Sequence, residues 1–171
     1  MKALLVIDML NDFVNEDGAL PVPDARTLVP SINREIKKCR EEASPIIFVC
    51  DAHDKDDREF LTWPKHAVDG TEGAKIIDEL DRRDSDMIVK KKRYSAFYDT
   101  SLETILEEKG VSTMVLTGVL TDICVMHTAS DASMRNYRVI VPEDCVKSVS
   151  KEAHDWAIKH MKDILLEVEV R

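Results

Sequence analysis

Cys124 is the residue of this chain best placed to act as a nucleophile. It follows an apolar run, residues 113–117, and stands near the predicted start of a helix. Free amide groups and the helix dipole at such a position lower the pKa of a thiol and favour the thiolate. The same amide groups could hold an oxyanion. A small, buried and inert side chain is the competing interpretation, because most free cysteines pack in the core.

Charged residues follow two other apolar runs. Asp8 ends the run 3–7, and carboxylates are rarely buried without a partner or a function. It could take the proton of a thiol, or it could equally cap the turn at residues 11–12. The basic residues 90–93 directly follow the run 87–89. Most of them are expected to be solvated, but one should point back over the sheet edge and balance Asp8 and a thiolate. Spacing alone does not say which one.

A third group has the composition of a metal site. Asp51 and His53 lie on the same side of an extended segment, since side chains alternate in β geometry, and His66 follows in the same polar loop. Glu59 is available between them. A carboxylate with imidazoles suits zinc, manganese or ferrous iron. The alternative is a polar loop with exposed histidines, and the acidic residues Asp54, Asp56 and Asp57 are expected to be solvated surface charge.

The remaining histidines and aromatic residues carry weaker signals. His127 would share a helical face with Cys124, but a local hydrogen bond is favoured over a catalytic dyad. Phe13 and Trp63 flank the predicted site and could stack on a flat substrate or belong to the core. Trp156 and the methionines are expected in the core, and His154 and His160 on the surface of a late helix.

Short apolar runs alternate with longer amphipathic segments along the chain. The predicted strands are residues 3–7, 46–50, 87–89, 113–117, 137–141 and 164–168. The predicted helices are an amphipathic one over 28–39, a short one at 74–80, one that opens on a capping box at 100–103 and ends at Gly110, and those at 123–136 and 153–161. This alternation predicts a three-layer α/β/α fold, with helices on both faces of a mainly parallel sheet of about six strands. Ligands bind beyond the carboxyl ends of such strands, where Asp8, Asp51 and the segment 118–124 all fall.

Composition narrows the class of protein. The 171 residues favour a single domain over 1–171, with a core that needs no disulfide or metal. With 24 basic and 33 acidic residues the formal net charge is −9, which argues against nucleic acid and anionic membranes as partners. No apolar run approaches the ~20 residues of a membrane span, and the apolar start is too short for a signal peptide. Four cysteines without paired spacing fit a cytoplasmic protein with reduced thiols.

Residues 3–13, 91–97 and 118–132 together resemble the isochorismatase-like cysteine hydrolases, specifically their nicotinamidase (pyrazinamidase) branch. The first segment is similar to the family's opening strand, whose catalytic aspartate corresponds to Asp8. The second is similar to its Lys-x-x-Tyr-Ser-Ala-Phe block, so Lys91 corresponds to the catalytic lysine. The third is similar to the block that carries the nucleophile, here Cys124. These segments occur in family order over essentially the whole chain.

The metal loop points to the branch. Nicotinamidases have Asp-x-His, then Trp-Pro-x-His and often Gly-Thr-Glu-Gly, and the residues 51–53, 63–66 and 70–73 are similar. The resemblance implies that Asp51, His53 and His66 hold one divalent ion, Zn²⁺ first and Mn²⁺ or Fe²⁺ as alternatives. Glu59 matches the position of a fourth ligand in some members. The ion would bind the pyridine nitrogen of the substrate and orient its ring.

The resemblance implies hydrolysis of nicotinamide to nicotinate and ammonia through a cysteine thioester, with activity on pyrazinamide and a role in NAD salvage. Asp8 would take the proton of Cys124 while Lys91 holds the charges. The N–H groups of Leu120 and Cys124 would bind the oxyanion, beside a cis peptide expected between residues 119 and 120. The implied substrate contacts are Phe13, Trp63, Tyr94, Val119 and Leu120. Leu120 is bulkier than the usual family residue and could narrow the pocket.

Two other functions stay open at this stage. The chain could be another amidase or carbamoyl hydrolase of the same superfamily, in which the metal is absent or structural. It could also be a non-catalytic binding protein on this fold, an interpretation that intact Asp8, Lys91 and Cys124 oppose. A homo-oligomer is a further open question, because exposed apolar surface cannot be located without coordinates.

Overall fold

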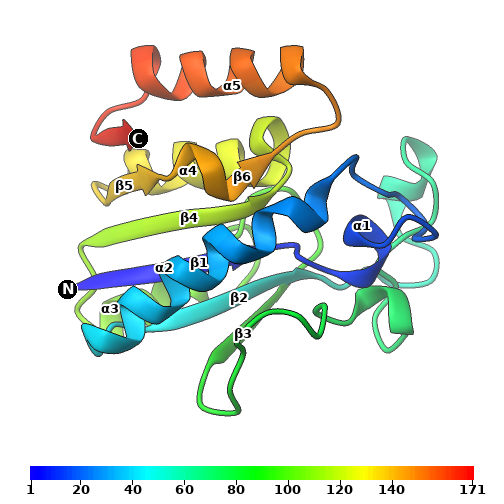
Figure 1. Cartoon of the computed structure of the whole chain (residues 1–171), viewed down its shortest axis with the longest axis horizontal. Coiled ribbons are helices and arrows are strands. Elements are labelled where there is room, and N and C mark those ends of the chain that lie inside the picture. Colours follow the sequence, from blue (N-terminus) through cyan, green and yellow to red (C-terminus); the bar gives the residue numbers. More distant parts are fainter.

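The strands of the computed structural model, which describes residues 1–171, form one parallel sheet (Figure 1). They are β1 (Lys2–Ile7), β2 (Ile46–Asp51), β3 (Met87–Lys91), β4 (Thr113–Val119), β5 (Arg138–Val141), β6 (Val146–Lys147) and β7 (Val168–Val170). Their order is β3-β2-β1-β4-β5-β7, and the short β6 pairs with β4. The predicted α/β class and the parallel sheet are confirmed, with seven strands in place of about six.

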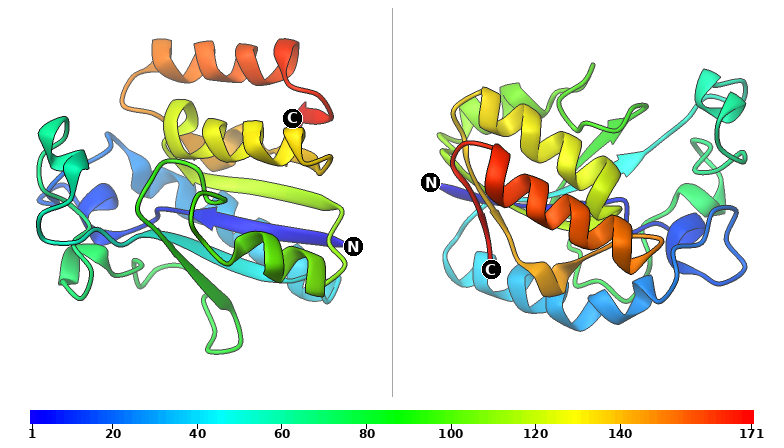
Figure 2. Two further views of the ribbon diagram at one scale, coloured as in Figure 1. Left: turned by 180° about the vertical axis from the view of Figure 1, so that it is seen from behind. Right: turned by 90° about the horizontal axis from the view of Figure 1, so that it is seen from above.

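Helices cover both faces of the sheet. They are α1 (Asn11–Val14), α2 (Val29–Glu41), α3 (Leu102–Glu108), α4 (Met126–Met134) and α5 (Lys151–Ile164). Leu4 and Val6 of β1 pack with α2 on one face, whereas Leu5 and Ile7 pack with α3, α4 and α5 on the other (Figures 1 and 2). Because both faces are covered, β1 and β2 are almost wholly buried, which explains their continuous apolar sequences. None of the helices has the length and apolar character that crossing a bilayer requires.

Two predicted elements are placed wrongly. The segment 74–80 is not a helix, apart from the 3₁₀ turn Glu72–Ala74, because Ile76 forms an antiparallel bridge with Leu10 and the Ile77 N–H donates to Met9 O. The last strand was predicted at 164–168, but α5 continues to Ile164 and the strand begins at Val168. Apolar residues in both segments satisfy either a helix or a strand, and tertiary pairing decides between them.

Two local predictions near α3 and α5 also fail. The capping box at 100–103 does not form: Ser101 precedes α3 without a side-chain cap, and the hydroxyl of Thr100 accepts from the Leu102 N–H instead. Trp156 was expected in the core, yet it is 55% exposed and stacks on His160 along the outer face of α5. Its amphipathic helix buries Ala157, Ile158 and Met161 instead.

Candidate active site and metal centre

Strand register brings three charged residues to one edge of the sheet. Asp51 at the end of β2 pairs directly with Lys91 at the end of β3, so their side chains share a face. Ile7, which ends β1, pairs with Val49 on one side and Gly118 on the other, which puts Asp8 at the same edge. Asp8 has a left-handed backbone (φ 52°), and its carboxylate accepts the Asp51 N–H at 2.8 Å. Asp8 and Asp51 are therefore neighbours although 43 positions separate them in the sequence.

Lys91 lies at the centre of this group. Its ammonium is 2.8 Å from Asp8 Oδ2 and 3.3 Å from the Cys124 sulfur, and it also donates to Asp51. The Lys91 side chain is fully buried, while those of Lys90 and Lys92 are 60% and 52% exposed. Of the basic residues that follow the third predicted strand, Lys91 is thus the one that points back over the sheet edge.

Cys124 reaches the same place through a sharp turn after β4. Gly118, with φ of +106°, lies so close to Ile7 that an added Cβ would be 1.9 Å from the Ile7 carbonyl oxygen. The expected cis peptide between Val119 and Leu120 is present. The Leu120 N–H has no backbone acceptor, and a π-helical turn, Thr121–Val125, then carries the cysteine into α4. Cys124, Asp8 and Asp51 thereby place their side-chain donor atoms within 4.8 Å of one another.

Burial sets the protonation state of this cluster. It raises the pKa of Asp8 to about 6, with a further contribution from the Asp51 charge, although Lys91 opposes both. Burial also raises the pKa of the Cys124 thiol well above its ordinary value, although the Lys91 charge acts against this. The expectation that the helix start lowers the pKa of this thiol is therefore wrong for this structure. The neutral thiol needs a base, and the Asp8 carboxylate is adjacent.

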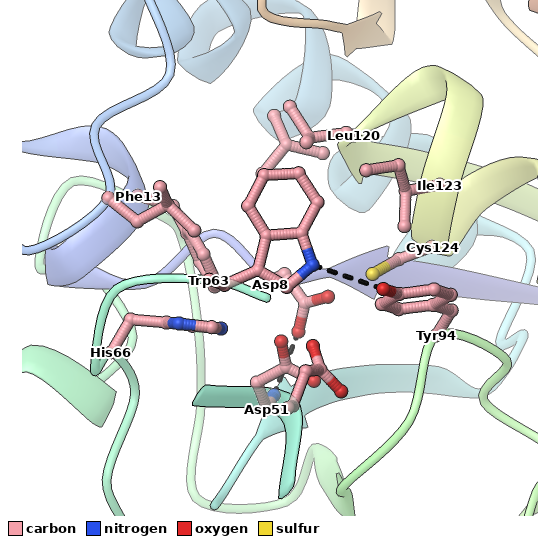
Figure 3. Close-up of a pocket in the computed structure, with 12 residues that line it drawn as sticks. Asp8, Phe13, Asp51, Trp63, His66, Tyr94, Leu120, Ile123 and Cys124 are labelled. Atoms are coloured by element: carbon pink, nitrogen blue, oxygen red, sulfur yellow. Dashed lines mark hydrogen bonds between the residues drawn. The ribbon is translucent and has the colours of Figure 1, made fainter. Parts of the chain in front are cut away.

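A pocket with mostly apolar walls opens onto the sulfur. Figure 3 shows Phe13 and His66 on one side and Cys124, Ile123 and Tyr94 on the other, with Trp63 between them. The Trp63 indole N–H donates to the Tyr94 hydroxyl at 3.0 Å. The twelve lining residues are Asp8, Phe13, Leu20, Asp51, Glu59, Trp63, His66, Tyr94, Val119, Leu120, Ile123 and Cys124. All five expected substrate contacts are among them, whereas Leu20 and Ile123 were not singled out from the sequence.

A second group of donors shares this pocket. The ligand atoms of Asp51, His53 and His66 lie within 4.8 Å of one another, and all three residues are buried. His53 Nε2 is buried without a hydrogen-bond partner, 3.6 Å from Asp51 Oδ2. An orphaned imidazole nitrogen beside a carboxylate and a second imidazole fits a divalent cation of the zinc type. Glu59 is less close: its Oε1 is 3.9 Å from His53 Nε2, and burial raises the pKa of its carboxyl.

The structure also tests the predictions made for Asp57, His127 and His154. Asp57 was expected to be solvated surface charge, but its side chain is only 3% exposed and its carboxylate lies 3.2 Å from His53 Nδ1. His127 bonds to the Ile123 carbonyl at 2.8 Å, which agrees with the local role favoured for it. His154, expected at the surface, is half-buried, and its ring bonds to the Thr121 hydroxyl at 2.9 Å. The contacts of Asp57 and His154, unlike that of His127, carry no signal in the local sequence pattern.

Comparison with known proteins places the chain and its fold in a family. Residues 2–169 match the isochorismatase domain. The zinc complex of a pyrazinamidase from Pyrococcus horikoshii has a TM-score of 0.93 at 32% identity, over 99% of this chain and 98% of that one. A pyrazinamidase/nicotinamidase of Streptococcus mutans has a TM-score of 0.92 at 36% identity, with both chains covered completely. An N-carbamoylsarcosine amidase of Thermoplasma acidophilum is 37% identical with a TM-score of 0.88, over 99% and 95%. This chain belongs to the isochorismatase-like hydrolases, enzymes that act on amide C–N bonds, and its relatives include nicotinamidases.

Proposed function

We propose that this enzyme hydrolyses nicotinamide to nicotinate and ammonia. The observation that carries the proposal is the fully buried Lys91 ammonium between Asp8 and the Cys124 sulfur, in the same pocket as the donor group of Asp51, His53 and His66. A nucleophile alone would fit many amidases. A nucleophile that shares a largely apolar pocket, lined in part by aromatic side chains, with residues able to bind a metal fits a flat amide that carries its own ring nitrogen.

Asp8 begins the reaction as the base. Its pKa of about 6 leaves it ionised near neutral pH, yet close enough to that pH for the carboxyl to release and recover a proton in turn. It takes the proton of Cys124, and the thiolate that forms beside the Lys91 ammonium attacks the carboxamide carbon. The developing oxyanion is received by the N–H groups of Leu120 and Cys124. The Leu120 N–H has no backbone acceptor in the structure, so it is free for this role.

The same carboxyl completes both halves of the cycle. Protonated Asp8 donates to the leaving nitrogen, the C–N bond breaks, and ammonia departs from a Cys124 thioester. A water molecule, deprotonated by Asp8, then attacks the thioester carbonyl. Nicotinate leaves, and the proton returns from Asp8 to the sulfur. Such a reaction would return the pyridine ring to NAD synthesis as the acid.

The remaining residues of the pocket hold the substrate. Phe13, Trp63 and Tyr94 offer aromatic surfaces to a flat ring, and Val119 and Leu120 close the apolar wall next to the sulfur. Asp51, His53 and His66, with Glu59 beside them, would hold one divalent ion, for which we propose Zn²⁺. When bound, such an ion supplies a Lewis-acid position for the pyridine nitrogen and so orients the ring.

Ammonia release from nicotinamide tests the nucleophile. Cys124→Ala should lower kcat/KM by about 10⁴-fold or more, because the thioester cannot form. Cys39→Ala is the matched control: this thiol is also buried, but it lies on α2 against the opposite face of the sheet, and its loss should leave the rate within about tenfold. Turnover by Cys124→Ala at the rate of the control would refute the mechanism.

A substrate panel tests the specificity. Identity of 37% with an N-carbamoylsarcosine amidase favours a carbamoyl hydrolase as the second candidate. Nicotinamide and pyrazinamide should be hydrolysed faster than N-carbamoylsarcosine, and removal of the metal by a chelator should slow the pyridine substrate most. Preference for the carbamoyl compound, unchanged by chelation, would select the second candidate instead.

A further inference from the structure

Acidic side chains lie next to both nitrogens of the His53 ring. The ring is fully buried, and Nε2 faces Asp51 Oδ2 at 3.6 Å and Glu59 Oε1 at 3.9 Å without a hydrogen bond. On the opposite side, Nδ1 is 3.2 Å from Asp57 Oδ2. A neutral imidazole carries one proton and one free lone pair, so the partner of Nδ1 decides which nitrogen can bind a metal.

Asp57 is itself fixed by three further hydrogen bonds. The Glu59 N–H donates to its Oδ1 at 2.9 Å, and Arg93 Nη1 donates to its two oxygens at 2.9 and 3.1 Å. Arg93 Nη1 also donates to the Lys92 carbonyl, so its guanidinium is held against the backbone of its own segment, which directly follows β3. An ionised carboxylate only accepts hydrogen bonds. Next to Asp57, His53 must therefore carry a proton on Nδ1, which leaves Nε2, the nitrogen that faces Asp51, as the one that can bind a cation.

The other imidazole of the group is fixed in a different way. His66 Nδ1 donates to the Pro64 carbonyl at 2.6 Å, so a backbone oxygen in its own loop sets its orientation. His53 has no such backbone partner for Nδ1; it depends on a side chain four residues away, and that side chain depends on Arg93. Outer carboxylates of this kind fix the tautomer of a ligating histidine and raise its basicity.

We propose that Asp57 is a positioning residue of the metal centre, which presents His53 Nε2 to a divalent cation, and that Arg93 holds Asp57 in that position. The inference deepens the proposed function, since it rests on Asp51, His53 and His66 as ligands. It also gives residues 91–93 two roles: Lys91 balances the thiol and Asp8, while Arg93 supports the metal ligands from the same segment.

The test measures metal affinity without any substrate. Metal-free Asp57→Asn protein is titrated with Zn²⁺ against a chromophoric chelator. Its Kd should be about 10–100-fold weaker than that of the wild type, because the amide must turn its NH₂ either toward His53 or toward the donors from Glu59 and Arg93. The matched control is Asp54→Asn, a carboxylate of the same loop that is 71% exposed and paired with Lys92; its Kd should stay within about twofold of the wild type.

Two readouts separate positioning from a general loss of structure. The visible absorption of the Co²⁺-loaded protein reports ligand geometry, and it should change in Asp57→Asn and stay unchanged in Asp54→Asn. If Asp57→Asn does not fold, Arg93→Gln replaces it: this variant keeps the carboxylate but loosens it, and should weaken Zn²⁺ binding by about tenfold.

Zn²⁺ affinity and a Co²⁺ spectrum equal to those of the wild type in Asp57→Asn, or in Arg93→Gln where it is the variant used, would overturn the inference. A wild type that binds no divalent ion would also overturn it. The choice of nicotinamide as substrate can fail separately, because these titrations contain no amide.

Discussion

Replacement of Lys91 by Gln probes the electrostatics at the centre of the site. The side chain is fully buried, and its ammonium contacts Asp8, Asp51 and the Cys124 sulfur. Gln has a similar length and can still donate a hydrogen bond, but it carries no charge. The Asp8 and Asp51 carboxylates then lose the ammonium that lies between them in the buried site.

The size of the effect follows from the 2.8 Å between the Lys91 ammonium and Asp8 Oδ2. At an effective dielectric constant of about 20, the attraction is about 6 kcal/mol. Its loss would raise the pKa of Asp8 by about 4 if nothing else in the site responded. Reorientation of dipoles and water will absorb part of this, so we expect the pKa of Asp8 to rise from about 6 to about 8 or above. The free energy of unfolding should fall by about 3–5 kcal/mol, because unpaired buried charges remain.

The assay is ammonia release from nicotinamide between about pH 5 and about pH 9, with urea unfolding of the same samples. Asp8 must be ionised to act as a base, so the rate is lost as the pH falls through its pKa. In the wild type kcat/KM should decline below about pH 6. In Lys91→Gln the decline should begin about two pH units higher, with at least about a tenfold loss at neutral pH and partial recovery at alkaline pH.

Lys90→Gln is the matched control, since this neighbouring lysine is 60% exposed and pairs with Asp69. Its pH profile should coincide with that of the wild type. If Lys91→Gln keeps an acidic limb near the wild-type position and loses less than about tenfold in rate, the charge argument is refuted.

Two further predictions concern stability. The Asp86 carboxylate accepts two hydrogen bonds from Arg40, at 2.8 and 2.9 Å, which outweigh burial and lower its pKa. The stability that this ion pair contributes is present above the unfolded-state pKa near 3.8 and is lost as the pH falls through the folded-state pKa. Asp86→Asn should therefore lower the free energy of unfolding in urea by about 3 kcal/mol at neutral pH and by less in acid. A loss that does not depend on pH would contradict this. Gly118→Ala should destabilise the protein by several kcal/mol or abolish folding, because the added Cβ would overlap the Ile7 carbonyl oxygen. Gly110→Ala is the comparison: Gly110 has a φ of +62° but open space around it, so the cost should be about 1 kcal/mol. Equal losses of stability in thermal melts would refute the clash.

The strands were predictable where burial on both faces requires a continuous run of apolar residues. Residues 3–7 and 46–50 are continuously apolar because helices cover both faces of β1 and β2, and the structure places these strands there. Residues 74–80 and 164–168 have apolar residues that fit more than one element. Their state depends on partners far away in the sequence, such as Leu10 for Ile76, and local propensity cannot identify those partners.

Within the site, Asp8 and Asp51 were predictable because each is the residue on which an apolar run ends, and parallel strands end at one edge. The motif around Tyr94 selected Lys91 among its basic neighbours. Asp57 was misjudged because it stands among acidic residues of a polar loop, where composition predicts solvation. Its burial results from the fold of that loop over His53 and from Arg93 on a different segment.

The sequence by itself determined the alternation of strands and helices, the edge of the sheet at which Asp8 and Asp51 meet, and the types of residue available there. These properties depend on local order along the chain. The tertiary structure alone decided the strand order, the contact of Lys91 with the Cys124 sulfur, the pKa of that thiol and the partners of His53. Each of these depends on the distance between segments and on exclusion of water, and neither is set until the two faces of the sheet are packed.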